Sequence, residues 1–198
     1  MYMKKAFIIF TCCILATGCC KYIITGDYSL SDVECSIGAD GGCAAVNGTY
    51  SDELVSITPV MESGCFSMNI INLSSKPIKI DWNSAAYTDE TESSYLIFTD
   101  SELNHRKHTQ LAGIVPAQSG SHFRLYPATL TKDNLYGRVT GFIRMNTEYS
   151  DRDEAENHLC KPVRLTIPIE CKGTAREYTF SFASDNARIW KIHPVFAE

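Results

Sequence analysis

Residues 65–82 read CFSMNIINLSSKPIKIDW, and this stretch decides the fold class. Two runs within it alternate between apolar and polar side chains. The apolar members are Phe66, Met68 and Ile70 in the first run and Ile78, Ile80 and Trp82 in the second. A period of two places such residues on one face of a strand. Residues 73–77 form a turn-like link, with Pro77 where a strand begins. The pattern predicts a β-hairpin.

The same two-residue period recurs along the chain. Further strands are expected at residues 54–60, 94–99, 122–126, 139–146, 163–171 and 178–183. Pro116 marks residues 114–117 as an edge or a connection. Helix is limited to a turn or two within residues 100–110 and 151–158. About seven or eight short strands with regular turns predict an all-β fold, an antiparallel immunoglobulin-like β-sandwich.

The N-terminal segment has the layout of an export signal. Lys4 and Lys5 precede an apolar run over residues 6–16, which is too short to span a bilayer as a helix. The sequence Ala-Thr-Gly before Cys19 resembles the lipobox of bacterial lipoproteins, in which the cysteine is diacylated and becomes the new N-terminus. We therefore expect a signal peptide over residues 1–18 and lipidation of Cys19. The alternative is a plain signal peptide that leaves a soluble periplasmic or secreted product.

Length and charge limit the possible functions. Without residues 1–18 the chain has 180 residues, enough for one domain with a real core. We expect an irregular, lipid-anchored lead over residues 19–50 and the β-sandwich domain over residues 51–198. The signal segment removes two lysines, which leaves 16 basic against 23 acidic residues, a net charge of −7. This balance argues against nucleic acid as a partner and against a polybasic grip on anionic lipid.

The cysteines predict disulfides. Six remain when Cys12 and Cys13 leave with the signal and Cys19 is lipidated. Of these, Cys20 lies beside the anchor, and the other five are the disulfide candidates Cys35, Cys43, Cys65, Cys160 and Cys171. An even number of cysteines in an exported chain is typical of a disulfide-stapled domain. A zinc site is the alternative, but closely spaced cysteine pairs of the usual kind do not occur after Cys20.

Spacing limits which cysteines can pair. Cys35 and Cys43 flank a glycine-rich loop and can close it locally. An extended strand between Cys160 and Cys171 would hold their sulfurs some tens of Å apart, since it rises about 3.3 Å per residue. These two are therefore not expected to pair with each other unless the run folds back at Pro168. Cys65 is the expected partner of one of them.

Residues 66–127 resemble a poorly characterised group of bacterial lipoproteins. The shared features are N-x-x-x-KPI-x-IDWN at residues 72–83, the Tyr-Thr-Asp turn at 87–89, a polar loop containing histidine, and an edge around Pro116. The resemblance implies a membrane-anchored β-sandwich and no particular chemistry.

Two polar clusters are candidate metal sites. His105 and His108 would share one face of a helix, but a metal needs further ligands, and the intervening Arg106 and Lys107 repel cations. Asp151, Asp153 and Glu156 could supply oxygen ligands to calcium, although the glycine and closing glutamate of an EF-hand are missing. Solvated loops are the expected structure for both, so no metal or cofactor is predicted.

Catalytic motifs are also missing. The chain contains no G-x-S-x-G, S-x-x-K or H-E-x-x-H sequence, and Ser121 and His122 would point to opposite faces of a strand. Four aromatic residues, Trp82, Tyr87, Tyr95 and Trp190, are expected in the core or on a rim that could bind glycan or peptide. No catalytic residue is assigned.

The sequence therefore predicts a non-enzymatic bacterial envelope lipoprotein that acts as a binding or assembly module. Its expected partners are the membrane, through N-terminal acyl chains, and an envelope protein that contacts a loop or an edge strand. The expected location is the outer membrane, facing the periplasm or the surface. The alternative is an envelope hydrolase or a metal-dependent binder that uses residues 105–108 or 151–158.

Overall fold

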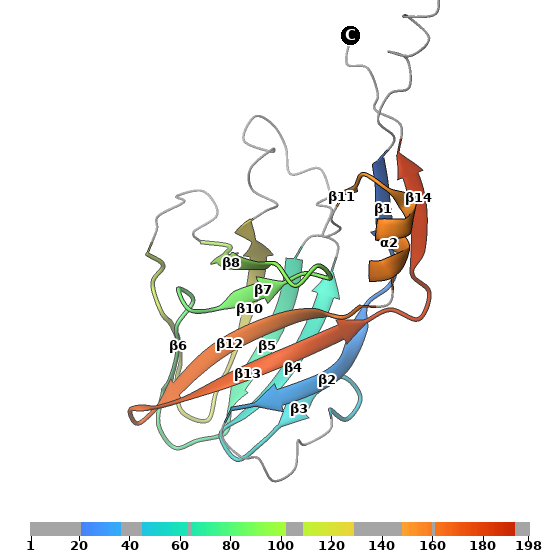
Figure 1. Ribbon diagram of the computed structural model, residues 1–198. Helices are drawn as coiled ribbons and strands as arrows, with labels where there is room; N and C mark the ends of the chain where they lie inside the picture. Colours follow the sequence, from blue (N-terminus) through green and yellow to red (C-terminus); the bar gives the residue numbers. More distant parts are fainter. Residues whose placement is uncertain are drawn as a thin grey trace, which may run out of the picture.

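The computed structural model describes residues 21–36, 45–62, 65–101, 109–128, 148–159 and 161–192. The described elements are almost all strands (Figure 1). They are β1 (Lys21–Thr25), β2 (Ser29–Cys35), β3 (Tyr50–Ser51), β4 (Val55–Glu62), β5 (Cys65–Asn72), β6 (Ile78–Ile80), β7 (Ala86–Thr88), β8 (Ser94–Thr99), β9 (Gly113–Val115), β10 (Gly120–Pro127), β11 (Glu148–Tyr149), α2 (Arg152–His158), β12 (Val163–Cys171), β13 (Thr174–Ala183) and β14 (Arg188–Ile192). The prediction of an all-β, antiparallel fold is confirmed.

The main sheet is one continuous antiparallel ribbon that bends back over itself. Its strand order is β2-β13-β12-β7-β8-β10-β5-β4-β3, and β6 pairs with β12 and β9 beside this path. Strand β8 forms the bend, because Ser94–Leu96 pairs with β7 and Ile97–Thr99 pairs with β10. The two arms face each other in Figure 1, with β12, β13 and β2 in front of β10, β5 and β4. The result is a nearly closed, barrel-like sheet.

The inward side chains of both arms form the main core. Strand β12 buries every second residue from Val163 to Ile169, and β5 buries Phe66, Met68 and Ile70. Aromatic rings fill the centre: Phe66 packs against Phe182 at 5.3 Å between ring centroids. The predicted inward positions of the opening stretch are confirmed, since Ile78, Ile80 and Trp82 are also buried.

The predicted hairpin between residues 66–71 and 78–82 is wrong, although both strands exist. β5 pairs with β4 and β10, whereas β6 pairs with β12 and β9. Residues 73–77 therefore carry the chain from one arm of the sheet to the other. Alternation places both runs against the core, but it does not specify which strands are neighbours.

The buried Asn72 side chain holds this crossing, residues 73–77, in place. Its Nδ2 donates to the carbonyl oxygens of Lys76, Val115 and Pro116 at 2.8, 3.1 and 3.0 Å. Its Oδ1 accepts from the Ser74 amide and hydroxyl at 2.9 and 2.8 Å. The Asn72 side-chain amide thus provides hydrogen bonds to backbone groups that would pair with each other in a hairpin.

The strand boundaries agree with the two-residue period in most places. Strands β8 and β12 have the expected limits, and β12 runs unbroken through Pro168. Among the described strands, β9 is an edge that pairs with β6 alone. The expected strand at 139–146 lies outside the described residues. The expected irregular lead is corrected for β1 and β2, which lie within residues 19–50 and pair with β14 and β13 near the other end of the chain.

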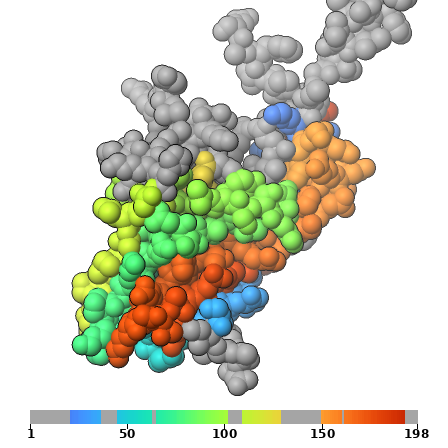
Figure 2. All heavy atoms as spheres, turned by 60° about the vertical axis from the view of Figure 1, so that its left-hand side comes forward, coloured from blue at the N-terminus to red at the C-terminus, as the bar shows by residue number. Residues whose placement is uncertain are grey.

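A second, three-stranded sheet has the order β11-β1-β14. Helix α2 covers one face, and Ile24, Tyr149 and Ala155 form a small core between them. The space-filling view shows the orange segment 148–159 against the green part of the main sheet (Figure 2). We call this unit the small sheet. In the described part of the chain, no helix is both long and apolar enough to cross a membrane.

Candidate binding site on the small sheet

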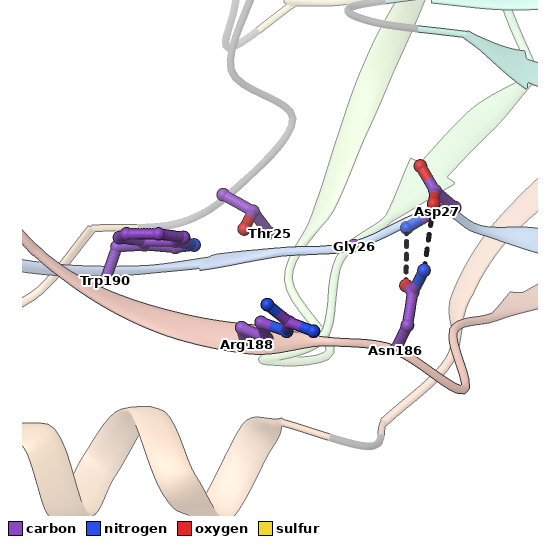
Figure 3. A pocket seen from close by; sticks show the side chains of 6 residues that line it. All are labelled: Thr25, Gly26, Asp27, Asn186, Arg188 and Trp190. Atoms are coloured by element: carbon purple, nitrogen blue, oxygen red, sulfur yellow. Dashed lines mark hydrogen bonds between the residues drawn. The ribbon is translucent and has the colours of Figure 1, made fainter.

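The face of the small sheet that points away from α2 carries an exposed tryptophan and an exposed arginine. Arg188 and Trp190 are alternate residues of β14, so their side chains project to the same side. In the register with β1, Thr25 is opposite Arg188 and Ile23 is opposite Trp190. We call this surface, made by Lys21, Ile23, Thr25, Arg188 and Trp190, the outer face. Figure 3 shows the side chains of Thr25, Arg188 and Trp190 on the side of the sheet opposite the helix.

A pocket of about 320 Å³ opens on this face. Its lining residues are Thr25, Gly26, Asp27, Asn186, Arg188 and Trp190 (Figure 3). They come from β1 and its link to β2 on one side, and from β14 and the turn before it on the other. The volume is at the lower end of the range for small-ligand sites, and the pocket is shallow and accessible.

Hydrogen bonds fix the inner end of the pocket. The Asp27 amide donates to Asn186 Oδ1 at 2.9 Å, and Asn186 Nδ2 donates back to Asp27 Oδ2 at 2.8 Å. The Ser184 hydroxyl donates to the same Asn186 Oδ1 at 2.9 Å. This reciprocal pair joins segments 159 residues apart, so the pocket has a preformed wall.

Charge and exposure make the rest of the pocket suited to binding. The Arg188 guanidinium has no ion-pair or hydrogen-bond partner among the described residues, and Trp190 is 56% exposed. The lining has one cation, Arg188, and one acid, Asp27, whose Oδ2 accepts a hydrogen bond from Asn186. A free guanidinium can hold a carboxylate or phosphate through two parallel hydrogen bonds, and an indole provides a flat apolar surface beside it.

A second pocket, of about 270 Å³, lies at the β12–β13 turn and is lined in part by Cys171, Lys172 and Arg176. Its arginine is already engaged, because Arg176 bonds Glu53 at 2.6 Å and Asp52 at 3.4 Å. The hydrogen bond from Arg176 lowers the pKa of Glu53, and the same bond raises the pKa of Arg176. These groups hold the β3–β4 link against β13.

Asp52 is the centre of that structural cluster. Its Oδ1 accepts from the amides of Leu54 and Val55, both at 2.8 Å, and its Oδ2 accepts from the Tyr178 hydroxyl at 2.9 Å. Burial, followed by the charge of Asp52, raises the pKa of Tyr178. These hydrogen bonds give Asp52 a structural role.

The candidate calcium ligands at 151–158 are helical, not part of a loop. Asp151 is the N-cap of α2 and accepts from the Asp153 amide, while Glu156 forms an ion pair with Arg152 at 2.8 Å. Their oxygens serve the helix itself. His105 and His108 lie outside the described residues. Within the described ranges, no three His, Cys, Asp or Glu side chains come together as a metal site.

His122 does meet a serine, but a different one from its sequence neighbour Ser121. Its Nε2 lies 2.8 Å from the Ser67 hydroxyl on the adjacent strand β5. Both lie on the outward face of the main sheet, and among the described residues His122 contacts no carboxylate that would orient its ring. Strand pairing brings the two together from 55 positions apart, which the sequence did not reveal.

The four aromatic candidates divide clearly. Trp82 and Tyr87 are buried, Trp82 packs edge-on against Phe123, and Tyr95 stacks on Tyr87. Trp190 alone among the four is largely exposed. Of these four residues, Trp190 therefore offers the largest exposed ring to a ligand.

The cysteines described are free thiols. Cys65 is buried and Cys35 and Cys171 are half-buried, and none of the three forms a disulfide. Cys19, Cys20, Cys43 and Cys160 lie outside the described residues. Cys65 is the expected partner of Cys160 or Cys171; it does not pair with Cys171, and Cys160 lies outside the described residues.

The chain matches no protein-family model, no curated protein and no solved structure. The resemblance of residues 66–127 to bacterial lipoproteins stays a prediction from those residues.

Proposed function

We propose that this protein is a bacterial envelope lipoprotein, anchored through acylated Cys19, whose β-domain is a binding module. The outer-face pocket is its binding site. The observation that carries this proposal is a preformed pocket in which the exposed Trp190 lies beside Arg188, whose guanidinium has no partner within the described ranges. Solvent-exposed tryptophan and arginine are enriched at the energetic centres of binding surfaces.

The lipid anchor is supported by the order of residues at the N-terminus. A basic pair, an apolar run and small residues precede Cys19, and β1 begins at Lys21. An acyl anchor at Cys19 would therefore be joined to the folded domain through Cys20 alone. Two or more acyl chains hold a protein durably on a membrane, whereas one chain binds reversibly.

The proposal includes finer features of the sequence-based prediction. The two arms of the main sheet would correspond to the layers of an immunoglobulin-like sandwich. Cys43 and Cys160 would form disulfides with described cysteines in an oxidising envelope. The location would be the outer membrane, facing the periplasm or the surface.

Anchoring is tested by Cys19→Ser in intact cells. The variant is expected to leave the membrane fraction, because the mature chain is acidic overall and the acyl chains supply its main attachment. Cys20→Ser is the matched control and should stay with the membrane. A Cys19→Ser protein that still sediments with membranes in high salt would contradict the proposal.

The binding site is tested with a photo-crosslinking residue placed at Thr25, which lines the pocket. Illumination of cells should give a discrete adduct, identified by mass as a protein, a glycan or a lipid. The same probe at Lys172, in the β12–β13 turn, is the control. Equal labelling from both positions, or none from Thr25 under several growth conditions, would count against the pocket.

A further inference from the structure

We infer that the outer face of the small sheet docks on the headgroup layer of the membrane that holds the anchor, with an anionic phospholipid headgroup at Arg188. The inference rests on the proposed lipidation of Cys19 and names the ligand class of the same site. It follows from chain length, strand register and the distribution of charge.

Chain length places the small sheet at the bilayer. Lys21, the first residue of β1, is two positions after Cys19. Two residues span at most about 7 Å, since an extended chain covers roughly 3.3–3.6 Å per residue. The headgroup region on each side of a bilayer is about 5–7 Å thick, from the difference between its total and hydrocarbon thickness. The start of β1 must therefore lie in or directly above the headgroups.

Strand register places Trp190 close to the anchored end of β1, so that it reaches the headgroup layer when the strands lie along the membrane surface. In the antiparallel pair, Lys21 is opposite Ile192 and Ile23 is opposite Trp190. Trp190 is thus two positions along the strands from Lys21, a rise of about 7 Å. Tryptophan favours the membrane interface, where its ring contacts apolar groups and its N–H remains hydrated.

Charge differs between the two faces of the small sheet. The outer face has Lys21 and Arg188 from β1 and β14, against Glu148 of β11, which is opposite Ile23, and Asp27 in the pocket lining. The opposite side has Lys191 and α2, where Asp153, Glu154 and Glu156 are exposed and Arg152 is paired with Glu156. The helix side is therefore the more acidic of the two, and an anionic surface repels it more strongly than the outer face.

The pocket has the size and donors for one headgroup. The Arg188 guanidinium can donate two parallel hydrogen bonds to a phosphate, and the Thr25 hydroxyl lies on the same face. Asn186 is held by Asp27, which keeps the far wall in place. A phosphate at Arg188 would leave the ring of Trp190 beside the glycerol and upper acyl region.

Tryptophan fluorescence tests this directly, because Trp82 and Trp190 are the two tryptophans and Trp82 is 2% exposed. The full acylated chain, purified from membranes, is reconstituted in phosphatidylglycerol-containing and in pure phosphatidylcholine vesicles. Each set includes a lipid with a nitroxide on its headgroup. We expect strong quenching of the Trp190 emission, greater in the anionic vesicles, and little quenching in Trp190→Phe protein.

Matched variants separate the effect of the Arg188 charge from the contact of Trp190 with the headgroups. Arg188→Gln should remove the difference between the two vesicle types, whereas Lys172→Gln, which removes one charge at the β12–β13 turn, should leave it unchanged. Equal quenching in both vesicle types for the unmodified protein would overturn the assignment of an anionic headgroup to Arg188.

Mass spectrometry of the same sample shows whether Cys19 is acylated, and so distinguishes a missing lipid anchor from a missing docked orientation. Acylated protein with unquenched Trp190 would overturn the docked orientation and leave the anchor intact. A protein adduct at Thr25 together with unquenched Trp190 would assign the face to a protein partner instead. A chain without acyl groups at Cys19 would overturn both the anchor and this inference.

Discussion

The Tyr149 hydroxyl donates a 3.0 Å hydrogen bond to the buried Glu90 carboxylate, 59 residues earlier in the chain. The link extends further, because His158 stacks on Tyr149 and its Nδ1 lies 2.9 Å from the Glu90 carbonyl oxygen. Tyr149 and His158 belong to the small sheet and its helix, whereas Glu90 follows β7 of the main sheet. These contacts tie the two units together.

Loss of the Tyr149 hydroxyl should therefore destabilise the fold. Tyr149→Phe removes one charged hydrogen bond from a buried carboxylate, and we expect a loss of about 1.5–3 kcal/mol in the free energy of unfolding. Urea denaturation measures it. Tyr22→Phe is the control on the adjacent strand, since no hydrogen bond of that hydroxyl occurs within the described ranges. Equal stability of the two variants would contradict a structural role for the contact.

Removal of the Asn72 amide should open the crossing between the two arms. Asn72→Ala leaves carbonyl groups of Lys76, Val115 and Pro116 without this donor, and we expect a loss of about 2–4 kcal/mol. Asn69→Ala, an exposed position on the same strand, should change stability by less than about 0.5 kcal/mol. Thermal unfolding of both variants decides it. Similar melting temperatures would show that the Asn72 hydrogen bonds contribute little to the stability of the fold.

Gly113 lies against the ring of Trp82, so a larger residue should be rejected there. A Cβ on Gly113 would lie 2.8 Å from Trp82 Nε1 and 3.1 Å from Cε2. The ring is buried and cannot retreat easily, so Gly113→Ala should cost about 1–3 kcal/mol. Gly120→Ala is the control, because its Cβ would meet its nearest atoms at 3.7 Å. Calorimetry should find that only the first substitution lowers the melting temperature clearly.

The Cys65 thiol should be the slowest of the three described cysteines to react. Burial, with the nearby charge of Glu62 as the second cause, raises its pKa from 9.0 to about 11. Because the folded pKa lies above the unfolded value, the protonated thiol contributes stability below pH 9.0, and this is lost as pH rises through about 11. In protein kept reduced, alkylation at pH 8 should modify Cys35 and Cys171 first.

Peptide mapping measures the order in which the three cysteines are alkylated. In denaturant the difference between them should disappear. Without reductant, complete protection of Cys65 even in denaturant would indicate a disulfide, as the sequence led us to expect. Rapid alkylation of Cys65 in the native protein would contradict its burial.

Alternation of apolar and polar residues predicted what each strand buries, but not which strand it pairs with. Strands β8 and β12 could be located because their inward positions repeat every second residue. β1, with the sequence KYIIT, has no such alternation and depends on β14 for its structure. The pocket was missed because its two sides lie about 160 residues apart, although the alternation of Arg188 and Trp190 was a signal in the sequence.

Pairing of the first strands with the last has a consequence for how the chain folds during synthesis. β1 and β2 occupy residues 21–35, yet their partners β14 and β13 occupy residues 174–192. Synthesis proceeds from the N-terminus at about 5–20 residues per second. The first two strands must therefore wait about 8–30 seconds, with open edges, until the last strands have been synthesised. Early acylation of Cys19 would hold these waiting strands at the membrane, away from other chains, so that the anchor would also protect the folding protein from aggregation.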